Sequence, residues 1–180
     1  MLICLGAFVA ALLLSAALTP AGRWLAGRLG AMDPPEPRKI HPLPIPRLGG
    51  VGVAAAFGVV LTAALAVQGP LEAPWMAMGL GGAAMVALGV VDDLRGLRPW
   101  TKLGVETAVA TALVVAGLRI DRFDPLLLPA IELEALAVPL TVLWIVGITN
   151  AVNLIDGLDG LAAGVGVIAT ATLVGVAALH

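Results

Sequence analysis

Long apolar runs separated by short polar stretches are the dominant pattern along the 180 residues. A helix that crosses a membrane needs about 20 mostly apolar residues, and the runs approach or reach that length. The pattern predicts an all-α, polytopic integral membrane protein with about six transmembrane helices, organised as a single transmembrane domain over residues 1–180. The predicted spans are Leu2–Leu18, Leu48–Val67, Ala73–Val91, Leu103–Leu118, Ala135–Thr149 and Leu161–Leu179.

The composition supports a membrane protein over a soluble one. The chain is 60% hydrophobic and 12% charged, whereas a soluble domain is about 45–50% apolar and about 25% charged. Glycine is frequent within the runs, as at Gly79, Gly81 and Gly82, which suits close helix packing in lipid. A net charge of −2 gives no electrostatic footprint for nucleic acid. Cys4 is the single cysteine, so an internal disulfide is excluded.

Positive charge is unevenly divided between the predicted loops. The loops at about 20–47 and 92–102 carry five and three of the 10 Lys and Arg residues, and the positive-inside rule therefore makes them cytoplasmic. The N-terminus is then outside, and the polar loop at about 150–160 is also cytoplasmic. The first apolar run lacks the basic start of a signal peptide, so we interpret it as a true span.

Two adjacent carboxylates, Asp92 and Asp93, end the third predicted span. A helix C-terminus carries about half a negative charge, and neighbouring like charges repel each other. Mg²⁺ would relieve both effects, because it binds one or two carboxylates and bridges to substrate phosphates. The alternative is an acidic helix end paired with Arg95 or Lys102, and these residues alone favour neither explanation.

Four polar residues recur at intervals of three before the last predicted span: Asn150, Asn153, Asp156 and Asp159. Residues three apart are neighbours on a helix, so these side chains would form one stripe at the membrane surface. Carboxylates and amides supply metal ligands, proton acceptors and hydrogen bonds to a polar head group. An ordinary turn, with Asp159 capping the last span, is the alternative; the register of all four residues argues against it.

Cations flank the same predicted surface. Arg47, beside Gly49 and Gly50, has the geometry to fork onto phosphate oxygens, and His41 titrates near neutral pH. Lys102 opens the fourth span and either snorkels to the interface or neutralises a substrate phosphate. Topogenic charge and lipid head-group contact are the alternative roles of the proline-rich stretch. Carboxylates and cations at a membrane surface suit metal-dependent phosphoryl transfer to a lipid-borne phosphate.

Three strings together resemble the polyprenyl-phosphate N-acetylhexosamine-1-phosphate transferase family (glycosyltransferase family 4). They are Arg38–His41 with Pro44–Gly50, Val91–Asp93 and Asn150–Leu161. The first is closer to the branch that uses UDP-GlcNAc and related sugars than to the branch that uses UDP-MurNAc-pentapeptide. The resemblance implies transfer of GlcNAc-1-phosphate, or a related HexNAc-1-phosphate, from a UDP-sugar to undecaprenyl phosphate, with release of UMP and with Mg²⁺ or Mn²⁺ as cofactor.

The resemblance also implies a setting and a set of site residues. The enzyme would act on the cytoplasmic face of the bacterial inner membrane, in cell-wall or surface-polysaccharide biosynthesis, and a homodimer is left open. The expected catalytic residues are Asp92, Asp93, Asp156 and Asp159; the substrate-binding residues are His41, Arg47, Lys102, Asn150 and Asn153; the metal ligands are Asp92, Asp93 and Asn153.

The sequence departs from the family pattern in one respect. Family members continue with further helices, a Gly-Asp-x-Gly-Ser motif and a His-rich cytoplasmic loop, and these are not in this sequence. We therefore expect the N-terminal part of a larger family fold, catalytically incompetent by itself. A non-enzymatic membrane protein for binding or transport is the alternative. A transporter would place its polar residues near the bilayer midplane, whereas the predicted clustering at one surface favours an enzyme.

Overall fold

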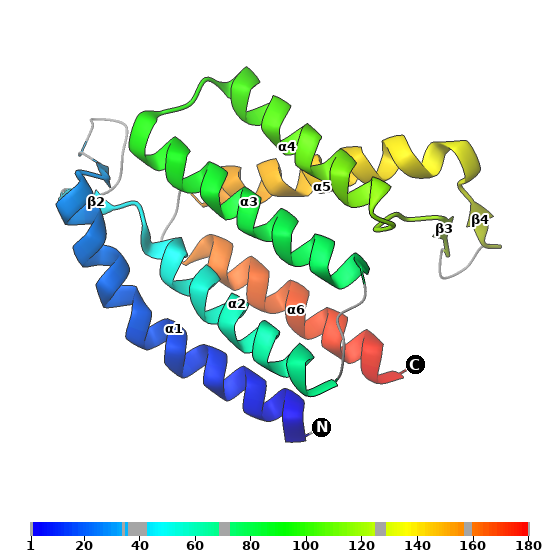
Figure 1. Ribbon diagram of the computed structural model, residues 1–180, viewed down its shortest axis with the longest axis horizontal. Coiled ribbons are helices and arrows are strands. Elements are labelled where there is room, and N and C mark those ends of the chain that lie inside the picture. Colours follow the sequence, from blue (N-terminus) through cyan, green and yellow to red (C-terminus); the bar gives the residue numbers. More distant parts are fainter. Residues whose placement is uncertain are drawn as a thin grey trace. The chain divides into compact units, whose positions relative to one another are not determined.

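The computed structural model describes residues 2–33, 35, 43–68, 73–124, 129–156 and 160–179. Over these ranges the chain is almost wholly helical (Figure 1), which confirms the all-α fold with about six helices. The short strands β1 (Met32–Asp33) and β2 (Ile45–Pro46) pair antiparallel, as do β3 (Arg122–Phe123) and β4 (Ile131–Glu132). The helices are α1 (Leu2–Leu29), α2 (Gly49–Gln68), α3 (Ala73–Arg95), α4 (Pro99–Val115), α5 (Ala137–Ile155) and α6 (Leu161–Leu179).

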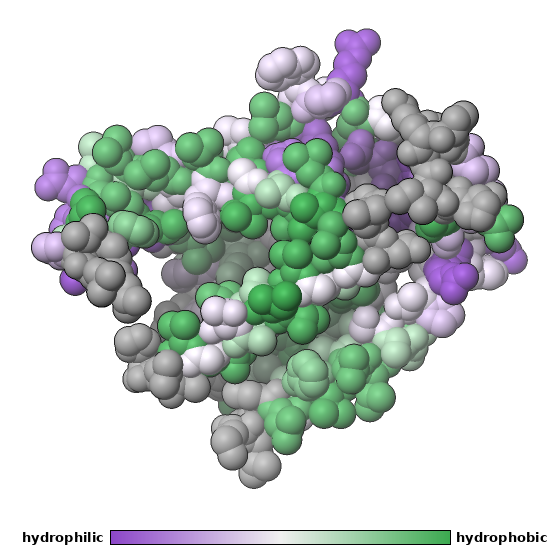
Figure 2. Space-filling model, turned by 180° about the vertical axis from the view of Figure 1, so that it is seen from behind, coloured by the Kyte–Doolittle hydropathy of each residue, from purple (hydrophilic) through white to green (hydrophobic). Residues whose placement is uncertain are grey.

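The helices have the length and surface of membrane spans. Among the described residues, four helical segments are long and apolar enough to cross a bilayer: Leu5–Leu29, Gly49–Val67, Ala73–Arg95 and Glu134–Ile155. Large apolar side chains are exposed along them, and Figure 2 shows hydrophobic residues over much of one face. Such a surface would favour aggregation in water but is the normal one in lipid. The protein is a multi-pass membrane protein.

Threonine hydroxyls within the helices donate hydrogen bonds to the backbone of their own helix. The Oγ1 atoms of Thr62, Thr107 and Thr172 each donate to the carbonyl four residues earlier, at 2.8 Å. A hydroxyl that faces hydrocarbon without a partner is costly, so this local bond lets threonine sit in an apolar helix. The pattern agrees with helices that face lipid.

Several helix ends differ from the predicted spans, and three of the differences have a clear local cause. The first helix continues through Pro20 to Leu29; proline removes one backbone bond there, but the following turns are composed mainly of good helix formers. Helix α4 starts at Pro99, earlier than predicted, because proline at the first helical position has the required φ. Helix α5 runs on to Ile155, since Asn150 and Asn153 alternate with apolar residues that sustain the helix.

The structure divides into two compact units, Met1–Leu118 and Arg119–His180, which are described separately. In the first unit, glycines bring α1 and α2 close together. A Cβ at Gly22 would lie 3.0 Å from the Leu48 carbonyl oxygen, and one at Gly52 would lie 3.1 Å from the Leu18 backbone. Small residues permit this approach, which is how helices commonly associate in lipid. Gly81 of α3 makes the corresponding close contact with the Leu113 side chain of α4.

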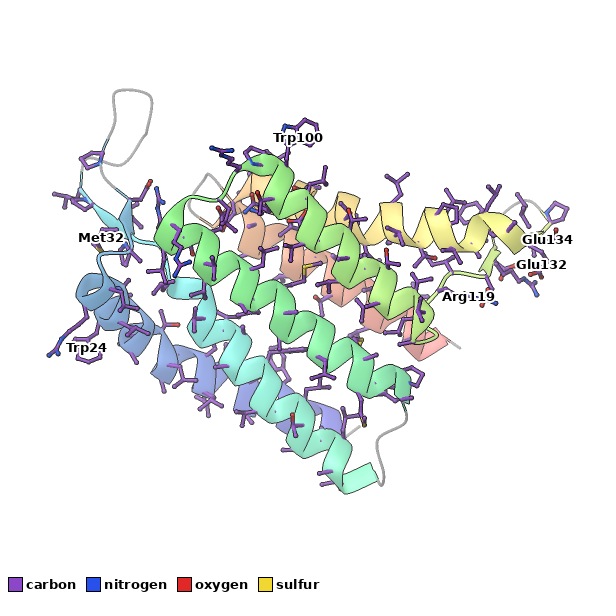
Figure 3. The ribbon with its side chains drawn as sticks, turned by 45° about the horizontal axis from the view of Figure 1, so that its top comes forward. Trp24, Met32, Trp100, Arg119, Glu132 and Glu134 are labelled. Atoms are coloured by element: carbon purple, nitrogen blue, oxygen red, sulfur yellow. The ribbon has the colours of Figure 1, made fainter. Side chains whose placement is uncertain are left out.

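The second unit consists of the β3–β4 hairpin, a 3-10 turn (Glu134–Leu136), α5 and α6. The buried Thr141 hydroxyl joins the hairpin entry to α5: it accepts a hydrogen bond from the Ile120 N–H at 2.9 Å and donates to the Ala137 carbonyl at 2.6 Å. Figure 3 shows Arg119, Glu132 and Glu134 gathered at the hairpin end of this unit. Its charges are largely paired within the hairpin, as in Arg122–Asp124 at 3.0 Å.

Candidate functional site

Two of the predicted polar loops meet at one end of the first unit. A small core of Ala26, Ala31 and Leu48 closes this end, and Val90 of α3 packs against it. The β1–β2 pair and the α3–α4 turn therefore lie over the same core. Figure 3 labels Trp24, Met32 and Trp100 toward this end of the helices. We call the residues Asp33, Arg47, Asp92, Asp93 and Lys102 the turn cluster.

Asp92 holds the α3–α4 turn together. Its Oδ1 atom accepts the Leu97 N–H at 2.9 Å, and its carbonyl oxygen accepts the Gly96 N–H at 2.7 Å. Gly96 has φ +62°, in the left-handed region that glycine adopts without strain. The other carboxylate oxygen, Oδ2, lies 3.1 Å from the Lys102 Nζ. The ion pair left open by the sequence therefore exists, and it joins the end of α3 to the start of α4.

Arg47 is held by an acid that sequence reasoning did not select. Its Nε donates to Asp33 Oδ1 at 3.1 Å, and its Nη2 contacts the same oxygen. That hydrogen bond, followed by the negative charges of Asp33, Asp93 and Asp92 in that order, raises the pKa of the Arg47 guanidinium above its ordinary value; partial burial acts in the opposite direction. The turn cluster is therefore electrostatically connected. In the sequence, Asp33 stands 14 residues before Arg47, on the other side of a proline-rich stretch. That position was only a weak signal for the ion pair.

The second motif lies in the second unit, at the end of α5. Asn150 and Asn153 are on the last turns of the helix, three residues apart, and Asp156 follows as its C-terminal cap residue. The Asn150 amide donates to the Val146 carbonyl at 2.9 Å and is half-buried, whereas Asn153 and Asp156 are exposed. An exposed carboxylate at a helix C-terminus lies where the helix dipole disfavours it, so a bound cation would stabilise it.

Not all of the predicted site residues lie within the part of the chain that the structure describes. His41 and Asp159 lie outside the described residues. Asp92 and Asp93 belong to the first unit, and Asn153 belongs to the second. Within the described ranges, no three His, Cys, Asp or Glu side chains lie close enough to hold a metal ion. The adjacent Asp92 and Asp93 still fit Mg²⁺, because this ion uses one or two carboxylates and completes its shell with water and substrate phosphate.

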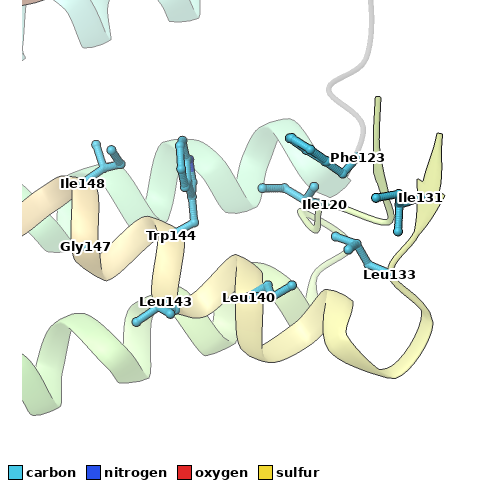
Figure 4. A pocket seen from close by; sticks show the side chains of 9 residues that line it. All are labelled: Ile120, Phe123, Ile131, Leu133, Leu140, Leu143, Trp144, Gly147 and Ile148. Carbon is cyan, nitrogen blue, oxygen red and sulfur yellow. The ribbon is translucent and has the colours of Figure 1, made fainter. Parts of the chain in front are cut away.

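A cavity of about 570 Å³ lies between the hairpin and α5 of the second unit (Figure 4). Every described residue that lines it is apolar, and none of these residues supplies an acid, a base or a metal ligand. Its lining residues are Ile120, Phe123, Ile131, Leu133, Leu140, Leu143, Trp144, Gly147 and Ile148.

Comparison with known proteins adds the family. Residues 75–180 match the family described as "Glycosyl transferase family 4". The probable undecaprenyl-phosphate N-acetylglucosaminyl 1-phosphate transferase of Bacillus subtilis is 42% identical over 168 residues, covering 93% of this chain and 46% of that protein. The decaprenyl-phosphate N-acetylglucosaminephosphotransferase of Mycobacterium tuberculosis is 36% identical over 159 residues, covering 81% of this chain and 38% of that protein.

A second group of relatives is more distant. The phospho-N-acetylmuramoyl-pentapeptide-transferase of Lactobacillus delbrueckii subsp. bulgaricus is 34% identical over 143 residues, covering 71% of this chain and 43% of that protein. The chain spans less than half the length of each of these three relatives. No solved structure matches it.

Proposed function

The chain belongs to glycosyl transferase family 4, as its motifs indicated, and we propose that it takes part in transferring a sugar-1-phosphate from a UDP-sugar to undecaprenyl phosphate. The observation that carries the proposal is the turn cluster. It places three acids and two cations at one end of a set of membrane helices. Such a surface can receive a phosphate from the lipid and another from a soluble nucleotide sugar at the same depth.

GlcNAc-1-phosphate, or a related HexNAc-1-phosphate, is the proposed group transferred. The Bacillus subtilis relative is named for N-acetylglucosamine and covers 93% of this chain at 42% identity. The relative named for the muramoyl-pentapeptide covers 71% at 34%. The first motif, Arg38–His41 with Pro44–Gly50, also favours this sugar, because it resembles the branch of the family that uses UDP-GlcNAc. The donor is therefore proposed to be UDP-GlcNAc or a close analogue, rather than a donor that carries a peptide.

The proposed reaction is an in-line displacement at phosphorus. An oxygen of the lipid phosphate forms a bond to the phosphorus that carries the sugar, and the bond from that phosphorus to the bridging oxygen breaks, so UMP leaves with the electron pair. Lys102 and Arg47 bind and orient phosphate oxygens, and Asn150 and Asn153 hydrogen-bond the nucleotide sugar. Asp156 and Asp159 complete this side of the site. Residues of both units are assigned to one reaction on the strength of the motifs and the family.

Mg²⁺ (or Mn²⁺) is the proposed cofactor, with Asp92, Asp93 and Asn153 as the candidate ligands. When bound, it would neutralise the charge that develops on the transferring phosphoryl group. The distribution of Lys and Arg supports a site on the cytoplasmic face of the bacterial inner membrane, with the N-terminus outside. The product would enter cell-wall or surface-polysaccharide synthesis.

The test uses the chain by itself and a fusion in which it replaces the matching part of the Bacillus subtilis relative. Each is purified in detergent and assayed for UMP release and lipid-linked sugar, with undecaprenyl phosphate and either UDP-GlcNAc or UDP-MurNAc-pentapeptide. We expect the fusion to turn over UDP-GlcNAc, to lose activity with EDTA and to regain it with Mg²⁺. Binding of neither substrate and turnover of neither donor would overturn the proposal in favour of a non-enzymatic membrane protein.

A further inference from the structure

The last two turns of α1 carry two arginines and a tryptophan on the side of the helix that faces away from the protein. We propose that this surface, formed by Arg23, Trp24, Gly27 and Arg28 and called here the α1 end face, binds the phosphate of an anionic phospholipid such as phosphatidylglycerol. The site is separate from the turn cluster and is independent of the transfer reaction.

The length of α1 places these residues at the edge of the hydrocarbon. At 1.5 Å per residue, a helix of 28 residues is about 42 Å long, whereas the hydrocarbon core of a bilayer is about 30 Å thick. The apolar run Leu2–Leu18 fills most of that core, so the turns after Pro20 extend into the head-group layer. The phosphates of membrane lipids lie in the same layer.

Packing on the opposite side of the helix fixes the direction of the α1 end face. Ala26 is fully buried in the core that contains Leu48, and a Cβ at Gly22 would lie 3.0 Å from the Leu48 carbonyl oxygen. Successive helical residues turn by about 100°, which places Trp24 nearly opposite Gly22 and Ala26. Trp24 is 59% exposed, and Figure 3 shows it directed away from the helices. The α1 end face is therefore turned outward from the described unit.

The four residues of the face form a continuous arc. By helical rotation, Arg23 and Arg28 lie at its two edges, and Gly27 and Trp24 lie between them. A Cβ at Gly27 would have nothing within 4 Å, so the glycine leaves open space between the two cations. A phosphate can approach the helix there and meet both guanidinium groups.

Trp24 also positions one of the two cations. The Arg28 Cζ lies 4.5 Å from the centroid of the Trp24 ring, within the range at which an aromatic face attracts a cation. Stacking uses the face of the guanidinium and leaves its in-plane N–H donors for hydrogen bonds. Because tryptophan is enriched at the membrane–water interface, the stacked pair presents phosphate donors at that depth.

The charge of the face is not balanced within the part of the chain that the structure describes. Helix α1 contains no Asp or Glu, and no described carboxylate is paired with Arg23 or Arg28. The described ion pairs involve other cations, namely Arg47, Lys102, Arg119 and Arg122. The helix dipole and the positive-inside rule both favour a cation at this end, but neither accounts for an outward face with a stacked tryptophan. An anionic head group supplies both the opposite charge and the hydrogen-bond acceptors.

Lipid selectivity of the purified 180-residue chain tests the site without any enzymatic activity. The chain is equilibrated in micelles with equal amounts of phosphatidylglycerol and phosphatidylcholine, and native mass spectrometry counts the bound lipids. A basic residue near an anionic surface contributes about 5-fold to binding. We therefore expect the double variant Arg23→Gln, Arg28→Gln to lower the preference for phosphatidylglycerol by about 5- to 25-fold.

The matched control is the double variant Arg119→Gln, Arg122→Gln, which removes the same number of charges from arginines that are already paired with acids. It should lower the preference by less than about 2-fold. Equal losses in the two double variants would show that net charge alone attracts the lipid, and an unchanged preference after loss of Arg23 and Arg28 would exclude the site. Either result would overturn the proposal.

Variants that keep the charge test whether the face is built for a head group. Arg23→Lys with Arg28→Lys loses the planar fork, and Trp24→Leu loses the stacking, so each should lower the preference by about 2- to 3-fold. Trp24→Phe keeps a ring and should lose less than Trp24→Leu. Full preference in both the lysine and the leucine variants would reduce the face to unspecific positive charge and overturn the proposal.

Two further measurements separate the remaining explanations. Because the side chains are exposed, every variant should keep Tm within about 1 °C of wild type; a larger fall would mean that the face is packed against protein and not lipid. Added inorganic phosphate should leave the bound phosphatidylglycerol in place, since the acyl chains hold the head group at this depth. Displacement by inorganic phosphate would assign the face to a soluble anion and contradict a lipid site.

Discussion

The α3–α4 turn and the end of α5 carry the two most informative motifs of the sequence, and they are built in different ways. At the turn, Asp92 is bonded to the Leu97 backbone and to Lys102 within the protein. At the end of α5, Asn153 and Asp156 are exposed, and Asp156 is the residue at which the helix stops. The first motif is braced by a backbone hydrogen bond and an ion pair, whereas the second ends in an exposed carboxylate at Asp156.

The difference separates two kinds of functional residue. A group that also holds the fold should affect both stability and activity when it is changed, because its partners lose their position. An exposed group at a helix end, such as Asp156, should affect activity alone.

Asp156→Ala should abolish transfer by the active fusion, with a loss of at least about 1,000-fold in kcat, and should change Tm by less than about 1 °C because the side chain is exposed. UMP release and a melting curve on the same sample measure the two effects. Asp124→Ala is the matched control, since Asp124 is an exposed acid of the same unit that pairs with Arg122 on the hairpin. Equal activity loss in both variants, or a large fall in Tm for Asp156→Ala, would remove the contrast.

Arg47→Gln should reduce kcat/KM by roughly 10- to 100-fold and should also lower stability by about 0.2–1 kcal/mol, because its pair with Asp33 is partly exposed. The raised pKa of Arg47 sets the sign of its pH dependence. Stability from a raised pKa is fully present below the ordinary pKa of arginine in the unfolded chain and is lost only as pH rises through the still higher pKa of the folded state.

The Tm difference between wild type and Arg47→Gln should therefore be constant from about pH 6 to about pH 9. Melting curves across this range measure it, and Arg47→Lys serves as the charge-conserving control. A Tm difference that shrinks as pH rises through this range would show that the stabilising charge is not that of Arg47.

Gly96→Ala should destabilise the turn by about 1–2 kcal/mol, because a side chain at φ +62° is strained. The change should also reduce activity modestly by moving the Leu97 N–H away from Asp92. Gly104→Ala is a suitable control, since Gly104 is helical with open space around it and alanine favours the helix by about 1 kcal/mol. Equal Tm values for the two variants would mean that the turn geometry is not under the proposed constraint.

The helices were predictable because the bilayer sets both their length and their composition. Contacts that depend on individual side chains were not. Glycine frequency indicated close packing, yet of Gly79, Gly81 and Gly82 only Gly81 lies within contact distance of another helix in the described part of the chain, at Leu113. The direction each glycine faces depends on helix rotation, which nearly uniform apolar faces do not specify.

The candidate site was likewise predictable in its residue types but not in its side-chain contacts. The acid pair and the cations were recognisable from residue type and spacing. Their grouping was not, because an ion pair such as Asp92–Lys102 depends on how sharply the Gly96 turn reverses the chain. Asp33 was missed since β1 and β2 are too short to give a periodic signal, and the pairing of Met32 with Pro46 is what brings Asp33 to Arg47.

The smallest expected effect concerns Asn150 of α5. Its side chain is bonded within its own helix, yet it belongs to the motif proposed to bind substrate. Its amide donates to the Val146 carbonyl, a backbone group that already serves the helix, so Asn150→Ala should change stability by only about 0.5 kcal/mol in either direction. Activity should nevertheless fall if the amide serves the nucleotide sugar, and the loss should appear in KM for UDP-GlcNAc more than in kcat. Ala151→Ser, one position along on the exposed face, is the control. An unchanged KM in Asn150→Ala would limit the functional stripe to Asn153 and the residues after it, and the end of α5 would then begin its role one turn later than the motif suggests.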